Sequence, residues 1–295
     1  MRRILVTGRG GQLATGLEAS LPAQGFEAVL VGQPDFEFDQ PETVQAAFAA
    51  VRPDAVVNTA AWTAVDAAED DEPAAFRANA LGPALLGRLC GEAGIPLVQI
   101  STDYVYDGLG TAPYVETALP NPSSAYGRTK LAGEWAALAA CPQTLVLRTA
   151  WVYSPVGRNF VRTMLAVGAQ RPELRVVNDQ HGNPTSAPDL ADAIAGVLAR
   201  VRETGWQASY RGVFHAAGSG HTHWHEFAEA IFAAAAPFGG PRPVVHPVGS
   251  HEYPTKAKRP ANSRLDTGKL KATFGVELPA WQDGLAQVVK ALHAG

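Results

Sequence analysis

The first half of the chain alternates short apolar runs with longer amphipathic segments. The apolar runs lie at residues 2–8, 27–32, 54–61, 96–102 and 143–153. They lack a polar residue at every second position, which is typical of strands buried on both faces. Helical patterns lie between them, at 11–25, 41–53, 72–93 and 123–140. This alternation predicts an α/β fold in which helices cover a parallel sheet.

The second half of the chain has a looser pattern after about Tyr153. Its clearest elements are a helix within 182–201, a strand at 212–218 and a helix at 222–236. Residues 237–262 are rich in Pro, Lys, Arg and His without a period, and resemble a functional loop. We therefore expect a dinucleotide-binding domain at 1–150 and a smaller substrate-binding domain at 151–295. Part of 186–220 is expected to return to the first domain.

A glycine-rich loop follows the first apolar run, in the stretch "ILVTGRGGQLA". Gly8 and Gly11 allow a tight turn and let a pyrophosphate approach the backbone. The helix that follows offers free N–H groups to that phosphate. The spacing is G-x-x-G-x-x-A, with Ala14 in place of a third glycine, but its place between strand and helix fits the mechanism. We interpret the loop as nucleotide-binding, in a Rossmann-type doubly wound sheet.

The choice of nicotinamide cofactor depends on the end of the second run. An acid there would hold the ribose 2′-hydroxyl of NAD, but the chain has Gly32 and Gln33. Arg9 could meet a 2′-phosphate instead, so NADPH is favoured and NADH stays open. Asp39 is either a partner of the adenine amino group or the N-terminal cap of the helix at 41–53.

The helix at 123–140 carries Tyr126 and Lys130 four residues apart, so that both lie on one helix face. Lys130 could equally pair with Glu134, although that order of charges is the less favourable one. The spacing alone therefore does not establish a catalytic pair. The apolar side chains expected to pack this helix on the sheet are Leu131, Trp135 and Leu138.

The location of this pair favours catalysis. In an open α/β sheet, ligands bind beyond the carboxyl ends of the strands, where the glycine loop and Thr102 are both expected. A helix that begins near Ser123 brings Tyr126 beside them. A neighbouring ammonium favours the phenolate of a tyrosine, whose pKa is ordinarily about 10. The hydroxyls of Thr102 and Tyr126, with Lys130 beside a nicotinamide, can reduce a ketone.

Motifs along nearly the whole chain resemble those of the dTDP-4-dehydrorhamnose reductase family, in the extended short-chain dehydrogenase/reductase superfamily. They are "VTGRGGQL", "NTAAWTAVDAAE", "NALGPALL", "STDYVYDG", "YGRTK", "LRTAWVY", "QHGNPTSAPDLA" and "RPANSRLDTGKL". The resemblance implies NADPH-dependent, or NADH-dependent, reduction of the C4 ketone of dTDP-4-dehydro-L-rhamnose to dTDP-L-rhamnose. The nucleotide and the sugar rest on this resemblance alone.

The resemblance also assigns roles to individual residues. Tyr126 would give a proton to the carbonyl oxygen, Thr102 would hydrogen-bond that oxygen, and Lys130 would hold the nicotinamide ribose. The other residues implied for the cofactor are Gly8, Arg9, Gly11, Gln12, Leu13, Asp39, Ala60, Ala61 and Thr63. Asp103 and Trp151 would contact the sugar of the substrate.

A basic stretch near the C-terminus is either a diphosphate-binding loop or a solvated one. Its cations are Lys256, Lys258, Arg259 and Arg264. Arg259 and Arg264 are the better candidates for the substrate diphosphate, because they lie in "RPANSRLD".

Other functions of the superfamily remain as alternatives. Dehydratases follow the threonine with Asp-Glu, whereas Thr102 is followed by Asp103 and Tyr104, which argues against dehydration. Another sugar-nucleotide reductase, an epimerase and a non-catalytic NADP-binding regulatory subunit stay open.

Composition limits the partners. The formal net charge of −4 provides no general electrostatic reason to bind nucleic acid or an acidic membrane. No apolar stretch approaches the ~20 residues of a membrane span, and we expect a soluble cytoplasmic protein, with a homodimer left open.

Cys90 is expected to be a buried thiol. His221, His223 and His225 alternate by two and suggest a solvated helix start rather than a metal site. The family resemblance also admits magnesium between subunits, but no acidic ligands can be assigned.

Overall fold

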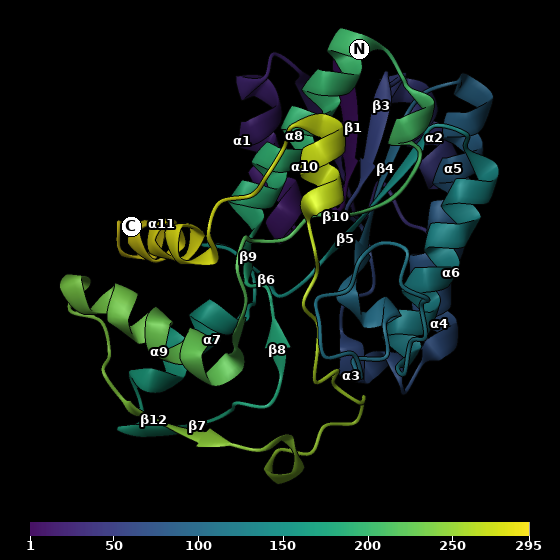
Figure 1. The fold of residues 1–295 in the computed structure, drawn as a ribbon. Helices are drawn as coiled ribbons and strands as arrows, with labels where there is room; N and C mark the ends of the chain where they lie inside the picture. Colours follow the sequence, from purple (N-terminus) through teal and green to yellow (C-terminus); the bar gives the residue numbers. More distant parts are fainter. Residues whose placement is uncertain (295) are drawn as a thin grey trace.

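Six parallel strands form one sheet in the computed structural model, which describes residues 1–294 (Figure 1). The strands are β1 (Arg3–Thr7), β2 (Glu27–Val31), β3 (Ala55–Asn58), β4 (Leu97–Thr102), β5 (Thr144–Thr149) and β10 (Gly212–His215). Their order is β10-β5-β4-β3-β1-β2, so the chain builds outward from β1 in both directions. This order confirms the doubly wound α/β fold and creates a crevice at the carboxyl ends of β1 and β3.

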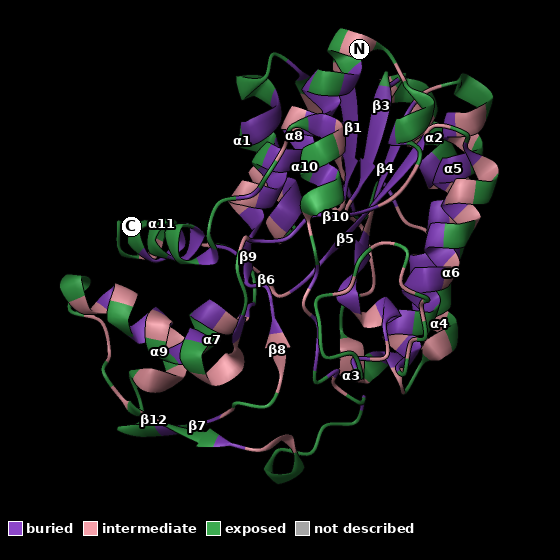
Figure 2. Cartoon of the chain, in the orientation of Figure 1, coloured by how far each residue is buried: buried purple, intermediate pink, exposed green. Residues whose placement is uncertain are grey.

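Helices cover both faces of this sheet (Figure 1). One face carries α1 (Gln12–Ala23), α8 (Ala187–Thr204) and α10 (Gly268–Phe274), and the other α2 (Pro41–Val51), α5 (Gly82–Ala93) and α6 (Ala125–Ala140). Within β1, Ile4 and Val6 join the first core and Leu5 the second. The strands β1, β3 and β4 are therefore almost wholly buried (Figure 2), which explains their unbroken apolar runs.

A second lobe lies beside the sheet (Figure 1). Its strand pairs are β7 (Glu173–Val177) with β12 (Val244–Val248), β6 (Val152–Tyr153) with β9 (Thr185–Ser186), and β8 (His181–Gly182) with β11 (Thr222–His223). Its helices are α7 (Phe160–Gly168), α9 (Trp224–Ala235) and α11 (Trp281–His293). They pack around Tyr153, Phe227 and Trp281. The domain boundary at residue 150, with its returning part of 186–220, stays a prediction.

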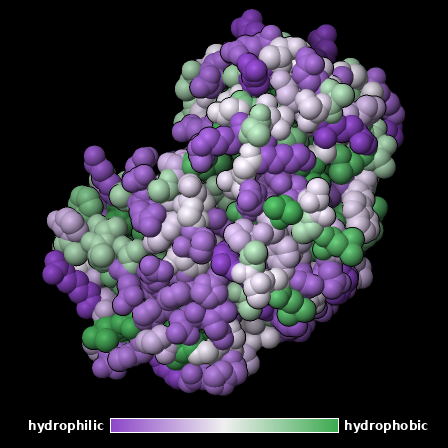
Figure 3. Space-filling view, in the orientation of Figure 1, coloured by the Kyte–Doolittle hydropathy of each residue, from purple (hydrophilic) through white to green (hydrophobic). Residues whose placement is uncertain are grey.

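The molecular surface is mixed in polarity. On the face drawn in Figure 3, polar residues are interspersed with small groups of apolar ones. No helix within residues 1–294 is long and apolar enough to cross a membrane. Short 3-10 turns lie at Asp103–Val105, Ala208–Tyr210, Ala236–Phe238 and Ser250–Glu252.

Three expected elements differ from the structure. The helical stretch at 72–93 divides into α4 (Glu72–Phe76), a π-helical turn (Arg77–Leu81) and α5. The run at 143–153 is not one strand, because Trp151 has φ 49° and separates β5 from β6. The irregular stretch 237–262 contains β12, whose partner β7 lies about 70 residues earlier in the chain. Local periodicity does not detect such a distant pairing.

The packing face predicted for α6 was wrong at Trp135, which is 61% exposed. Leu131 is buried as expected, but small and charged residues, Gly133, Glu134 and Ala137, occupy much of the buried side. Gly133 lies so close to the Asn79 carbonyl that a Cβ there would overlap it. Close backbone contact, rather than large apolar side chains, therefore holds this helix.

A buried ion pair joins α6 to the sheet. Both oxygens of Glu134 accept hydrogen bonds from Arg148 on β5, at 2.8 Å from Nε and 2.6 Å from Nη2. The two side chains are 1% and 3% exposed, respectively. Ser101 on β4 donates to the same carboxylate. Arg148 also donates to the Tyr106 hydroxyl at 2.7 Å, which lies 2.8 Å from His215 Nε2 on β10.

We predict that Glu134→Ala lowers the free energy of unfolding by about 3–5 kcal/mol, because Arg148 would be left buried and unpaired. Urea unfolding measures this loss. The matched control is Glu92→Ala, whose carboxylate pairs with Arg88 on the surface at 3.0 Å; its effect should stay within about 1 kcal/mol. Equal losses in both variants would contradict a structural role for the buried pair.

Candidate active site

Four strands end in polar residues at one edge of the sheet: Thr7 on β1, Asn58 on β3, Thr102 on β4 and Thr149 on β5. The strands are parallel, and Thr7 pairs with Asn58 and Thr102 with Thr149 in register. The carboxyl ends of these strands therefore lie side by side, at the edge of the sheet where the ligand site was predicted.

The glycine loop takes the conformation that a phosphate-binding turn requires. Gly8 has φ 84°, and a Cβ there would lie 2.8 Å from Thr59 Oγ1. Gly10, which the sequence analysis did not single out, has φ 83°. The Gly11 N–H donates to Gly8 O at 2.9 Å and closes the turn. No side chain caps α1, so its first N–H groups are free to bind an anion.

A cavity of about 450 Å³ opens beside this loop. It is lined by Gly8, Arg9, Gly32, Gln33, Phe36, Glu37, Phe38, Asp39, Ala60, Ala61, Trp62, Ala74 and Ala78. Five of the residues proposed for the cofactor are among them. The Arg9 guanidinium donates to Gln33 O at 3.1 Å and lies 3.5 Å from Asp35.

Aromatic residues of this cavity escaped the sequence analysis. Phe36 and Phe38 meet edge to face at 5.4 Å, and Trp62, in the loop after β3, also lines the cavity. The alternation of acidic and aromatic residues in "DFEFD" could have indicated that both phenylalanines lie on one side of the chain. Asp39 does not cap α2, as one interpretation proposed, but accepts from Arg77 Nε at 2.7 Å. Its role beside adenine stays a prediction.

The remaining cofactor candidates lie outside the lining of this cavity. Leu13 is buried in the core between α1 and the sheet. Gln12 Oε1 accepts from Ser154 and Asn159, both at 3.0 Å, and so ties the glycine loop to the second lobe. Gly11 closes the loop turn, and Thr63 is exposed.

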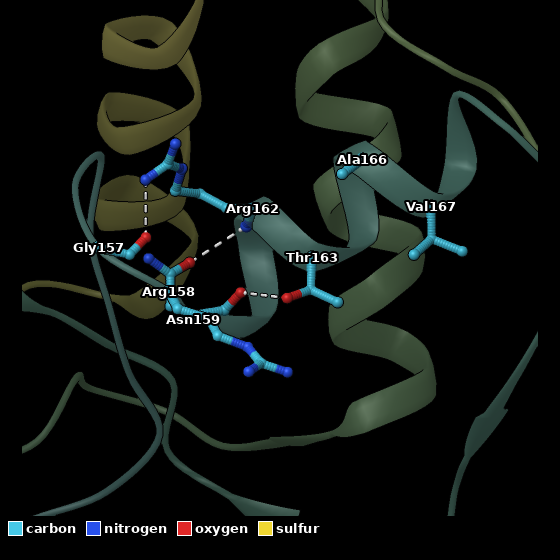
Figure 4. Close-up of a pocket in the computed structure, with 7 residues that line it drawn as sticks. All are labelled: Gly157, Arg158, Asn159, Arg162, Thr163, Ala166 and Val167. Atoms are coloured by element: carbon cyan, nitrogen blue, oxygen red, sulfur yellow. Dashed lines mark hydrogen bonds between the residues drawn. The ribbon is translucent and has the colours of Figure 1, made fainter. Parts of the chain in front are cut away.

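A second cavity of about 450 Å³ lies beside the start of α7 (Figure 4). Within its lining, Arg162 donates to Gly157 O at 2.7 Å and Thr163 to Asn159 O at 2.8 Å, while Asn159 also donates to Gln12. It shares no lining residue with the cavity of the glycine loop.

The start of α6 is held from several sides. Ser124 caps the helix by accepting from Gly127 N–H at 3.1 Å. Glu69 accepts from Ala125 N–H at 2.8 Å. Gly127 packs so closely on the Tyr104 carbonyl that a Cβ would overlap it. These contacts fix the backbone on both sides of Tyr126.

Tyr126 and Lys130 face the strand ends. Burial raises the pKa of the Tyr126 hydroxyl above its ordinary range, and the nearby Thr102 hydroxyl only partly opposes this. Lys130 Nζ donates to Ile100 O at 2.7 Å, and burial lowers its pKa to about 8. The expected lowering of the tyrosine pKa was therefore wrong: desolvation dominates and keeps the phenol protonated. Glu134 is engaged by Arg148, so the rival Lys130–Glu134 pairing does not form.

Asp103 is a buried carboxyl beside the catalytic candidates. Thr102 Oγ1 donates to Asp103 Oδ1 at 2.9 Å, and Oδ2 has no hydrogen-bond partner. Burial raises the pKa of Asp103 to about 6, although the hydroxyls of Ser263 and Thr102 partly oppose the shift. The Tyr104 ring meets that of Tyr126 edge to face at 5.5 Å.

Trp151 lies two residues after β5 and packs against the core of the second lobe. It stacks on Trp224 with ring centroids 3.5 Å apart, and its left-handed backbone turns the chain out of β5. Trp224 was not recognised from the sequence, because it lies within an ordinary amphipathic helix.

Of the four basic candidates, Arg259 lies beside Tyr104, whose ring meets that of Tyr126. Its Nη2 lies 2.5 Å from Asp66 Oδ2, and its Nη1 is buried without a partner. Arg264 instead donates to Thr111 O and Asn262 Oδ1, both at 2.7 Å. Lys256 pairs with Asp70, and Lys258 is exposed.

Of the three histidines near α9, His221 is exposed and the other two have structural contacts. His223 caps the helix by accepting from Glu226 N–H at 3.2 Å, and His225 lies 3.0 Å from Val245 O. Within residues 1–294, no group of three or more His, Cys, Asp or Glu residues could hold a metal ion. Cys90 is buried, and burial raises the pKa of its thiol.

Comparison with known proteins agrees with this geometry. Residues 1–294 match the family described as the RmlD substrate binding domain. The dTDP-4-dehydrorhamnose reductase of Sinorhizobium fredii is 41% identical over 98% of this chain and 97% of its own length.

Two solved structures of dTDP-4-dehydrorhamnose reductases also match this chain. That of Clostridium acetobutylicum has a TM-score of 0.90 at 37% identity, and that of Bacillus anthracis, in complex with NADP, has 0.89 at 32%. Each match covers 98% of this chain and 99% of the other. The chain therefore belongs to the dTDP-4-dehydrorhamnose reductase family.

Proposed function

We propose that this protein is an enzyme that reduces the C4 ketone of dTDP-4-dehydro-L-rhamnose to dTDP-L-rhamnose with NADPH. The observation that carries the proposal is the arrangement of Thr102, Tyr126 and Lys130 beside the glycine loop at the strand ends. Membership of the reductase family supports the choice of substrate.

The cavity beside the glycine loop fits a dinucleotide. The uncapped start of α1 and the close approach at Gly8 suit a pyrophosphate, and Phe36, Phe38 and Trp62 offer apolar surface to a base. Arg9 is the cation available for a 2′-phosphate, which favours NADPH over NADH. When bound, the reduced nicotinamide supplies a hydride.

The residues of the chain supply the proton and hold the developing charge. Protonated Tyr126 donates to the carbonyl oxygen of the ketone. The Thr102 hydroxyl, which now donates to Asp103, can turn to the same oxygen and stabilise it. Lys130, whose buried Nζ donates to Ile100 O, contributes positive charge below its pKa of about 8. Hydride and proton together convert the ketone to an alcohol.

Unpaired buried atoms support a polar substrate. Within residues 1–294, the buried side-chain atoms without a partner are Asp103 Oδ2, Thr149 Oγ1 and Arg259 Nη1. Such atoms are rare in folded proteins. Asp103 follows Thr102, and Thr149 pairs with Thr102 in register, so these two border the catalytic candidates. Asp103 can accept from a sugar hydroxyl, Arg259 can donate to the diphosphate, and Trp151 can contact the sugar ring.

The decisive experiment supplies the purified protein with NADPH or NADH and the 4-ketosugar nucleotide, and identifies the product. Reduction at C4 supports the proposal. An epimerase would interconvert sugar nucleotides without net oxidation of cofactor. A regulatory subunit would bind NADP without turnover. The homodimer, bound magnesium and the cytoplasmic location stay predictions from the sequence.

We predict that Tyr126→Phe lowers kcat by about 10²–10⁴-fold, because the carbonyl oxygen loses its proton donor. Affinity for NADPH, measured by fluorescence titration, should be retained. The control is Tyr253→Phe, which alters a tyrosine that is 63% exposed and should leave kcat unchanged. A Tyr126→Phe variant with near wild-type kcat would show that another group donates the proton.

We predict that Arg9→Ala weakens binding of NADPH by about tenfold and leaves NADH within about twofold, since only NADPH carries a 2′-phosphate. Calorimetric titration with each cofactor measures the difference. Arg88→Ala, which removes an exposed cation of α5, serves as control. Equal weakening of both cofactors would mean that Arg9 acts on the loop rather than on the 2′-phosphate.

A further inference from the structure

The one-turn helix α3 (Val65–Ala68) and the residue after it present two carboxylates, three residues apart, to distant parts of the chain. Asp66 reaches residues 257 and 259, and Glu69 reaches the start of α6. In Figure 1 the segment between β12 and α10 passes beneath α3 before it rises to the sheet. We call residues 253–262 the crossing segment.

The Asp66 carboxylate binds the crossing segment at one backbone N–H and at one side chain. Its Oδ1 accepts from Ala257 N–H at 2.9 Å, and its Oδ2 from Arg259 Nη2 at 2.5 Å. The guanidinium is planar, so a carboxylate on Nη2 restricts the direction of Nη1. Nη1 is buried without a partner, and an unpaired buried donor is costly unless a ligand supplies an acceptor.

Glu69 contacts the start of α6. Its Oε1 accepts from Ala125 N–H at 2.8 Å, one residue before Tyr126. An anion is favourable at the first turn of a helix, where N–H groups lack partners. The same short segment thus contacts both the backbone beside Tyr126 and the Arg259 guanidinium, the two groups proposed above for the ketone and the diphosphate.

We propose that Asp66 and Glu69 are positioning residues: Asp66 orients Arg259 towards the substrate diphosphate, and Glu69 orients Tyr126 towards the ketone. Neither carboxylate touches the substrate. This inference rests on the proposed function and adds how two distant parts of the site are aligned. It requires that loss of Asp66 affects substrate binding and that loss of Glu69 affects the chemical step.

The first test is Asp66→Asn, which keeps the shape of the side chain and an oxygen for Ala257 but removes the charge that holds Arg259. We expect KM for the sugar nucleotide to rise about tenfold, with kcat within about twofold and NADPH affinity unchanged. The matched control is Asp70→Asn, which removes a half-exposed ion pair with Lys256 and should change KM less than twofold.

A double-mutant cycle tests whether Asp66 acts through Arg259. Arg259→Ala alone should raise KM more than it lowers kcat. Adding Asp66→Asn to that variant should raise KM no further, because the contact is already lost. Arg259→Lys keeps the charge but not the planar fork, and should also raise KM, which provides a second variant if Asp66→Asn folds poorly.

The Glu69→Gln variant tests whether Glu69 orients Tyr126. We expect kcat to fall several-fold with KM unchanged, because the amide is a weaker, uncharged acceptor at the helix start. An unchanged KM in Asp66→Asn, a KM that falls, or additive effects in the cycle would overturn the role of Asp66. A Glu69→Gln variant that changes KM alone would overturn that of Glu69.

Binding of dTDP, measured by calorimetry, separates this inference from the proposed function. If the wild-type protein does not reduce the ketosugar, the proposed function fails, while weaker dTDP binding by Asp66→Asn still supports the alignment of Arg259. If the wild-type protein is active and Asp66→Asn binds dTDP as tightly, only the inference fails.

Discussion

The structure depends on one buried ion pair, Glu134 with Arg148. Two charges without access to water are tolerated only when every hydrogen bond is made, and here Ser101 and Tyr106 complete the set. This geometric demand fixes α6 on β4 and β5. Because Tyr126 and Lys130 lie on the same helix, the pair also determines how the catalytic candidates meet the strand ends.

Desolvation then sets the chemistry of the site. Burial keeps Tyr126 protonated, lowers the pKa of Lys130 to about 8 and raises that of Asp103 to about 6. A reductase needs a proton donor rather than a phenolate, so this direction suits the reaction better than the one expected from a neighbouring ammonium. The unpaired atoms of Asp103 and Arg259 leave hydrogen-bonding capacity for a substrate.

Much of the fold was predictable, because strands buried on both faces leave unbroken apolar runs and a glycine loop needs small residues at fixed positions. The failures share a cause. Trp135 is exposed, and Gly133, Glu134 and Ala137 stand on the buried face of α6 where large apolar side chains were expected. The strand β12 pairs with β7, which lies far away in the chain. Trp224 could not be recognised as part of the site's surroundings without its stacking on Trp151.

The sequence by itself determined the strands of the main sheet, the glycine loop, the shared helix face of Tyr126 and Lys130, and the family, since each depends on residue types at short, regular spacing. Only the tertiary structure decided between rival partners. In the structure, Glu134 pairs with Arg148 and not with Lys130, and Asp39 pairs with Arg77 and does not cap the helix. Arg259 pairs with Asp66. The physical reason is that charge pairing and desolvation depend on distance and burial in space, which spacing along the chain does not encode.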